Sequence, residues 1–144
     1  MDPKVEEIEA RRAARKAGHA AAREEQYAID LEALDALEVE HGDDSVARLD
    51  VERYVKGHPT FVVLRAPRHD EYKRFCDLVA RASDKGSTDA RRDAQDMLAH
   101  SVWVYPKESD ARKAMLKDFP GILLSIVLRA VKLVEAQATT EGKG

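Results

Sequence analysis

The chain has 144 residues, with 24 Lys or Arg against 27 Asp or Glu, so its formal net charge at pH 7 is only −3. A chain of this length with 44% hydrophobic residues can fill one core, and we expect one compact domain. The near balance of charge argues against a general binder of nucleic acids or anionic membranes, since such proteins usually carry a basic surplus.

Residues 4–41 are predicted to form one long helix or two in series, because they are rich in Ala, Glu, Arg and Leu and contain no proline. In residues 10–22 the only apolar side chains are alanines, so this half is expected to be exposed or frayed. The second half carries larger side chains at helical spacing, which should pack on another element. They are Tyr27, Ile29, Leu31, Leu34, Leu37 and Val39. Of these, Tyr27, Leu31 and Leu34 are candidate partner contacts.

The charge is unevenly distributed along the chain. Residues 1–50 hold 7 basic and 14 acidic side chains, whereas residues 51–144 hold 17 basic and 13 acidic side chains. An acidic N-terminal part with a net charge of −7 therefore precedes a remainder with a net charge of +4. We expect the two parts to attract each other, within one chain or between copies.

Two strands are predicted after this helix. Residues 45–51 alternate in polarity, and residues 60–65 form a β-branched and aromatic run. Gly57 and Pro59 lie between them, which favours an antiparallel hairpin with a loop of several residues. Because a two-stranded hairpin is not stable alone, a helix must cover one of its faces, and the stripe on residues 27–37 is a candidate.

Four helices are predicted to follow, at about residues 69–83, 88–104, 108–118 and from 120 onward. The last one is apolar nearly all round, which is typical of a helix inside a bundle or in the groove of a partner. Its apolar run contains charged residues and is shorter than the roughly 20 residues that cross a membrane. On this helix, the candidate partner contacts are Ile122, Ile126 and Arg129.

The predicted fold is therefore mostly helical with a small β-hairpin. We divide it into a helical N-terminal arm at residues 1–41, a compact domain of hairpin and four-helix bundle at residues 42–137, and a disordered tail at residues 138–144.

No motif for catalysis, metal binding or cofactor binding is found in the sequence, and we expect a protein that is not an enzyme. The five histidines have no metal-ligand spacing, and His58 is interpreted as a surface residue of a turn. Cys76 is the only cysteine and is expected to be a packed thiol on the inner face of helix 69–83. The basic cluster at residues 11–16 is interpreted as a solvated helix with internal ion pairs rather than a nucleic-acid arm.

Three segments carry a resemblance to a known family: FVVLRAPRHDEYKRF (Phe61–Phe75), VWVYP (Val102–Pro106) and MLKDFPGILLSIVLRAVKLV (Met115–Val134). Their order over about residues 42–136 resembles the small tail assembly chaperones of long-tailed bacteriophages. In that family a strand ending in Arg-x-Pro leads into a helix with a Tyr and a Phe, and a valine-valine-x-Pro helix end precedes a Phe/Tyr-Pro-Gly and a final apolar helix. The matching positions are Arg65, Pro67, Tyr72, Phe75, Val102, Val104, Pro106, Phe119, Pro120 and Gly121.

Two departures from the family pattern are visible. The family usually places Ser or Thr after the first proline as a helix N-cap, where this chain has Arg68 and His69. The N-terminal 25 residues lie outside the pattern altogether, so the resemblance implies nothing about their role.

The resemblance implies a non-enzymatic protein of the host cytoplasm that binds the long helical tape measure protein during phage tail assembly. The major tail protein is a second candidate partner, and neither nucleic acid nor a membrane is expected as one. Two alternatives stay open: a phage structural or connector protein that remains in the virion, and a small nucleic-acid-binding regulator. Self-association through the N-terminal arm is a further expectation.

Overall fold

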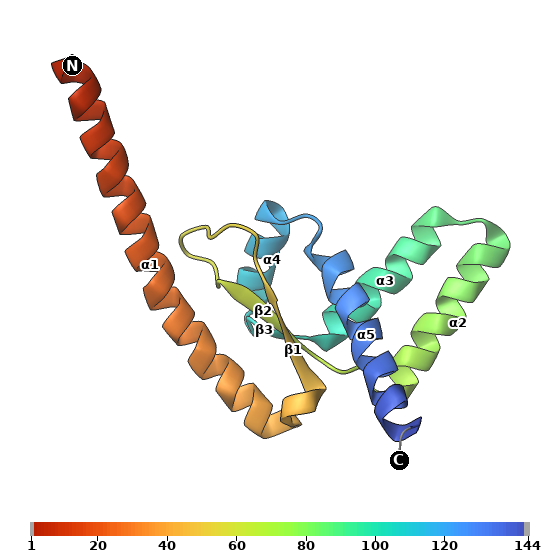
Figure 1. Ribbon diagram of the computed structural model, residues 1–144. Helices are drawn as coiled ribbons and strands as arrows, with labels where there is room; N and C mark the ends of the chain where they lie inside the picture. The colour runs from red at the N-terminus through yellow and green to blue at the C-terminus, as the bar shows by residue number, and fades with distance from the viewer. Residues whose placement is uncertain (1, 143–144) are drawn as a thin grey trace.

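The structure is a computed structural model that describes the backbone of residues 2–142 and the side chains of residues 2–137. It confirms a mostly helical fold with a small antiparallel sheet (Figure 1). The elements in chain order are α1 (Pro3–His41), a 3₁₀ turn (Asp43–Ser45), β1 (Val46–Asp50), β2 (Phe61–Arg65), α2 (His69–Lys85), α3 (Thr88–Val102), β3 (Trp103–Tyr105), α4 (Ser109–Asp118) and α5 (Ile122–Gly142).

The N-terminal helix α1 is continuous, so the alternative of two helices in series does not apply. Its start is capped by Asp2, whose carboxylate accepts a hydrogen bond from the backbone N–H of Lys4 at 2.9 Å. It ends at Gly42, which adopts a φ of 94° and donates its N–H to the carbonyl of Glu38. Residues 3–18 of α1, which we call the free arm, are all exposed and stand away from the body (Figure 1).

The sheet has three strands, in the order β1-β2-β3, where a two-stranded hairpin was predicted. β1 pairs with β2 from Val46 opposite Arg65 to Asp50 opposite Phe61. The predicted helix 88–104 ends at Val102 instead, and residues 103–105 form β3 against β2. Bulky aromatic and β-branched residues favour the extended backbone there, and this short strand pairs with β2 on the side away from β1.

The two faces of the sheet are covered by different helices. Phe61 and Val63 of β2 point to one face, where Leu34 and Leu37 of α1 pack against them. The stripe on residues 27–37 therefore covers the hairpin, as the sequence predicts. This second half of α1 belongs to the body, and only the free arm stands apart.

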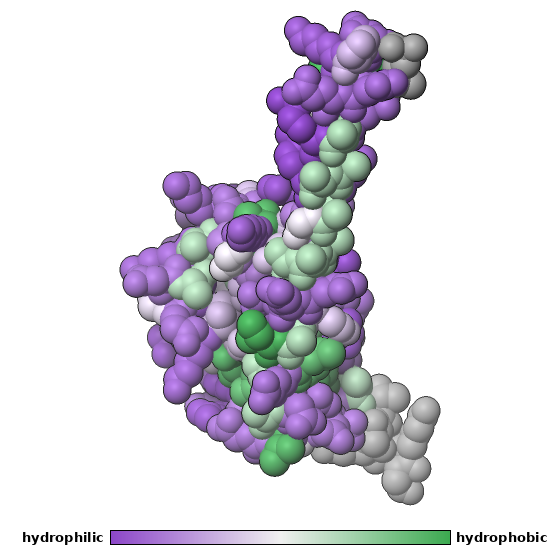
Figure 2. Space-filling view, turned by 90° about the vertical axis from the view of Figure 1, so that its left-hand side faces the viewer, coloured by the Kyte–Doolittle hydropathy of each residue, from purple (hydrophilic) through white to green (hydrophobic). Residues whose placement is uncertain are grey.

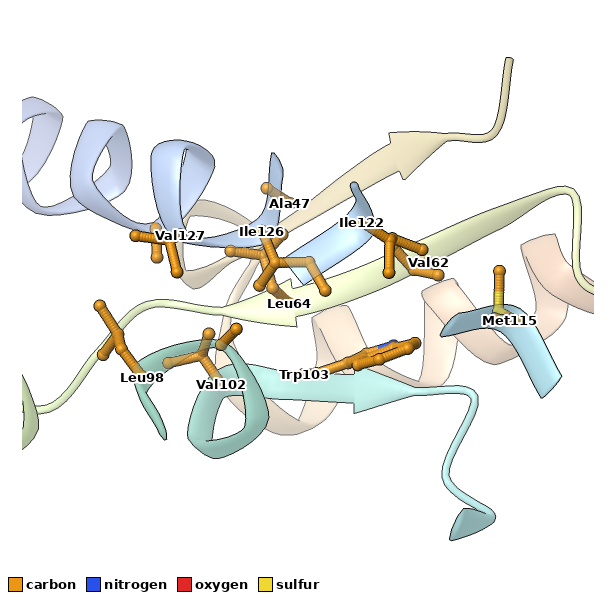
Figure 3. Packing of buried hydrophobic residues seen from close by; sticks show 12 residues of the cluster. Ala47, Val62, Leu64, Leu98, Val102, Trp103, Met115, Ile122, Ile126 and Val127 are labelled. Atoms are coloured by element: carbon orange, nitrogen blue, oxygen red, sulfur yellow. The ribbon is translucent and has the colours of Figure 1, made fainter. Parts of the chain in front are cut away.

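Val62 and Leu64 of β2 point to the opposite face, which holds the larger core (Figure 3). There they meet Trp103 of β3, Met115 of α4 and Ile126 of α5, all at most 2% exposed. α2 packs mainly against α3. The four C-terminal helices are thus present as predicted, but they share their core with the sheet.

The C-terminal helix α5 continues to Gly142. Residues 138–142 of the expected disordered tail are therefore helical, and residues 143 and 144 lie outside the described part of the chain.

Candidate functional site

A carboxylate with no exposed surface, Asp30, joins α1 to the sheet. Its Oδ2 accepts hydrogen bonds from the backbone N–H of Thr60 at 2.6 Å and from the Thr60 hydroxyl at 2.5 Å. Its Oδ1 accepts from the Tyr105 hydroxyl at 2.5 Å and from the Gln26 amide at 2.8 Å. Four donors from three elements of the chain therefore converge on one side chain.

The Asp30 cluster, consisting of Asp30, Gln26, Thr60 and Tyr105, is built to hold structure together. Burial, and then the hydrogen bond to Asp30, raise the pKa of Tyr105, so its phenol stays protonated and donates. Both oxygens of Asp30 already have two donors each, which leaves little capacity for a substrate. The sequence-based candidates did not include Asp30, although it lies on the same face of the predicted helix as Tyr27, Leu34 and Leu37, which was a visible signal.

A second cluster links the end of β2 to α2 and α3. The Arg65 guanidinium donates to both oxygens of Glu71, at 2.7 and 2.9 Å, and to the carbonyl of Ser101 at 2.8 Å. Hydrogen bonding to Arg65 is the main cause that lowers the pKa of Glu71. The same carboxylate accepts a hydrogen bond from the backbone N–H of Arg68 at 2.8 Å. Glu71 therefore contributes to capping α2, although the chain lacks the Ser or Thr that the family pattern has after Pro67.

Most of the other family-pattern positions lie at or near the junctions between elements, and two lie within α2. Pro67 and Pro106 are buried, and the carbonyl of Pro106 accepts a hydrogen bond from Arg112 Nε at 2.6 Å. Tyr72 and Phe75 are half-buried on α2, with ring centroids 6.5 Å apart. The turn between α4 and α5 holds Phe119, Pro120 and Gly121. These residues contribute to the packing and the turns of the fold.

An open groove of about 470 Å³ lies between the loop after β1 and the α4–α5 turn. At its edge His58 Nε2 lies 2.5 Å from Asp118 Oδ2, and the His58 ring meets Phe119 edge-on. His58 is only 9% exposed, so its interpretation as a surface residue was wrong. The hydroxyl of Ser125 in this groove donates to the helix carbonyl of Gly121 at 3.3 Å, so the groove joins no activated nucleophile to a base.

Cys76 is exposed, which corrects the prediction of a packed thiol. The helix α2 buries the face that contains Ala82 against α3, and Cys76 lies outside that face. Among the described residues no group of three or more His, Cys, Asp or Glu side chains is placed to hold a metal ion. No described helix is both long and apolar enough to cross a bilayer.

The six candidate partner contacts do not form one surface. Tyr27 is 38% exposed and accepts a hydrogen bond from Arg48 at 3.1 Å, and Leu31 is 39% exposed. Leu34 packs from α1 against the sheet. Arg129 is exposed on α5. Ile122 and Ile126 lie in the core at 8% and 0% exposure, because they are on the face of α5 that covers the sheet.

The exposed apolar side chains of α5 are Leu124 and Leu128, at 49% and 57%. They are four residues apart and so lie on one face of the helix, and half-buried Val131 extends the same face by a turn. The sequence indicates that α5 is apolar nearly all round, and the structure places two of the candidate contacts on it, Ile122 and Ile126, on its buried side. We call Leu124, Leu128 and Val131 the α5 stripe.

Comparison of the chain with protein-family models, with curated proteins and with solved structures finds no match.

Proposed function

We propose that this chain is a non-enzymatic tail assembly chaperone that binds the tape measure protein of a long-tailed bacteriophage in the host cytoplasm. The resemblance to the family pattern over residues 42–136 supports the proposal. The single observation that carries it is the α5 stripe, an exposed apolar row bordered by charged side chains.

The α5 stripe suits a helical partner. Leu124 and Leu128 project from a helix whose opposite face is fixed on the sheet by Ile126 and Ala130, so they form a rigid surface. An amphipathic helix can lay its own apolar face against such a row. Exposed Arg129 and Lys132 border the stripe and would favour acidic side chains beside that apolar face.

Co-expression with the tape measure protein, followed by size-exclusion chromatography, tests the proposal. We expect a complex with the unaltered chain and at least a tenfold loss of affinity for the double variant L124E/L128E, since two exposed apolar anchors become charged. Met97→Glu is the matched control, because Met97 is 37% exposed on α3 and lies outside the stripe. Failure of the unaltered chain to bind or solubilise the tape measure protein would contradict the function.

The alternative of a structural or connector protein has a separate test. Mass spectrometry of purified virions should find a chaperone absent or far below stoichiometric amounts, whereas a structural component should be present at a fixed copy number.

A further inference from the structure

The charges on α1 are segregated along its length. Residues 10–23, the basic segment, contain five Lys or Arg and no Asp or Glu. Residues 24–41, the acidic segment, contain seven Asp or Glu and no Lys or Arg. The sign of the charge changes between Arg23 and Glu24, close to the middle of the helix.

Most of these charges have no partner within the chain. In the described structure none of the five basic side chains lies within 4.0 Å of a carboxylate, so the internal ion pairs predicted for residues 11–16 do not form. Of the acidic segment, Asp30 is buried in its own cluster, and only Glu40 makes an ion pair, at 4.0 Å from His41. A straight helix cannot fold its basic segment back onto its acidic one.

The same helix has most of the exposed large apolar side chains. Among the described residues six of the nine lie on α1, namely Val5, Ile8, Tyr27, Ile29, Leu31 and Val39. Figure 2 looks onto the α1 side of the molecule, where pale green side chains run down the free arm and deeper green ones gather over the lower part. Exposure of this extent on one helix is typical of a surface that another element covers.

We infer that α1 pairs with α1 of a second copy in antiparallel orientation, centred near residues 23 and 24. This arrangement brings residues 10–23 of each copy against residues 24–37 of the other, and the two contacts are identical by twofold symmetry. The acidic residues Glu6, Glu7 and Glu9 lie beyond this complementary stretch. A parallel pair would place like charges together over the whole length. The inference does not rest on the proposed function, because α1 and α5 lie on opposite faces of the sheet.

A second copy fits α1 better than a nucleic acid does. The five basic side chains could contact a phosphate backbone, but the seven acidic side chains that follow on the same helix would repel it. The exposed Ile29 and Val39, at 59% and 81%, also lie in the acidic segment, where a phosphate backbone would leave them uncovered.

Charge reversal with sedimentation-velocity centrifugation of the full chain tests the pairing. Variant R11E/R15E/K16E changes the net charge of the basic segment from +5 to −1, and variant E25K/E32K/D35K changes that of the acidic segment from −7 to −1. Every altered residue is exposed and lies outside the ion pairs of the body. We expect the unaltered chain to dimerise and each variant alone to dissociate at least tenfold more readily. An equimolar mixture of the two variants should restore the dimer, a result that misfolded variants would not give.

The direction of pairing is tested by cysteine cross-linking in a Cys76→Ser background. Glu24→Cys lies near the proposed centre and should form a disulfide-linked dimer. Ala10→Cys should not, because its symmetry mate would lie about 40 Å away along the antiparallel pair. Cross-linking at both positions would indicate a parallel pair and overturn the inference.

Two further outcomes would overturn it. One is a monomer at low salt across the micromolar range. The other is a dimer that both charge-reversal variants leave intact. Salt-dependent binding of RNA or DNA by a monomeric chain would show that a polyanion is the occupant instead.

Discussion

The two parts of α1 have the same secondary structure but are held in place in different ways. Residues 19–41 contact the body from the His19 ring, which lies 5.2 Å from that of Tyr54, down to Leu37 in the core. Residues 3–18 have no such contacts, and their alanine-rich composition favours the helix by itself. The comparison shows that propensity can form a helix, whereas buried contacts determine where it lies.

Removal of the Asp30 carboxylate should have the largest effect, because it weakens the contacts that hold the second part of α1 on the body. Asp30→Ala leaves the buried donors of Thr60 and Tyr105 without an acceptor, and we expect a loss of about 3 kcal/mol in the free energy of unfolding. Urea denaturation followed by circular dichroism measures it. Asp35→Ala on the exposed side of α1 is the control and should change stability by less than about 0.5 kcal/mol.

Asp30→Asn is a finer test of the same cluster. The amide keeps one acceptor oxygen, so the free energy of unfolding should fall less in this variant than in Asp30→Ala. Equal stability of all three aspartate variants and the unaltered chain would mean that α1 is held by apolar packing alone.

Loss of the Arg65–Glu71 ion pair, which lies within the body, should lower the free energy of unfolding less than loss of the Asp30 cluster on α1. The effect should also depend on pH. Because the pKa of Glu71 is lower in the folded chain than in the unfolded one, its contribution is complete above the ordinary value of 4.5 and disappears as the pH falls through the lowered value. Glu71→Gln should therefore cost roughly 1–2 kcal/mol at pH 7 and much less at pH 3.

Chemical denaturation at the two pH values checks the Glu71 prediction. Asp77→Asn, at an exposed position on the same helix, should show no such difference between them. An equal cost of Glu71→Gln at both pH values would exclude the ionised pair as its cause.

The smallest expected effect concerns the free arm. Gly18→Ala adds a methyl group with no atom within 4 Å and should favour the local helix by about 1 kcal/mol. Amide hydrogen exchange in residues 10–18 should slow about fivefold, while the unfolding midpoint of the body stays the same. Gly86→Ala is the contrasting control. Gly86 has a φ of 63°, which residues with a side chain rarely adopt, so this variant should be less stable. Unchanged exchange would show that something other than helix propensity orders the arm.

Sequence patterns predicted the elements better than their contacts. Periodicity and capping residues were sufficient for the helices and for the first two strands, because those signals are local. They missed β3 because the helical pattern of residues 88–102 continues into Trp103–Tyr105, and only pairing with β2 selects the extended backbone.

The misplaced side chains have a similar cause. Cys76 lies at the edge of the apolar face of α2, and Ile126 lies on a helix that is apolar nearly all round, so the sequence alone does not fix whether each side chain is buried. The choice depends on which neighbour each helix meets, α3 for α2 and the sheet for α5. The Asp30 cluster likewise joins residues up to 75 positions apart, a separation that no local pattern reports.

We propose that the chain binds the tape measure protein through α5, on the opposite face of the sheet from α1. Hydroxyl-radical footprinting of the co-purified complex measures this directly, because it reports the exposure of individual side chains. We predict that Leu124 and Leu128 become protected by the tape measure protein, while labelling of Met97 stays as in the chain alone. Undiminished labelling of both leucines in a stable complex, or the absence of any complex, would contradict the account.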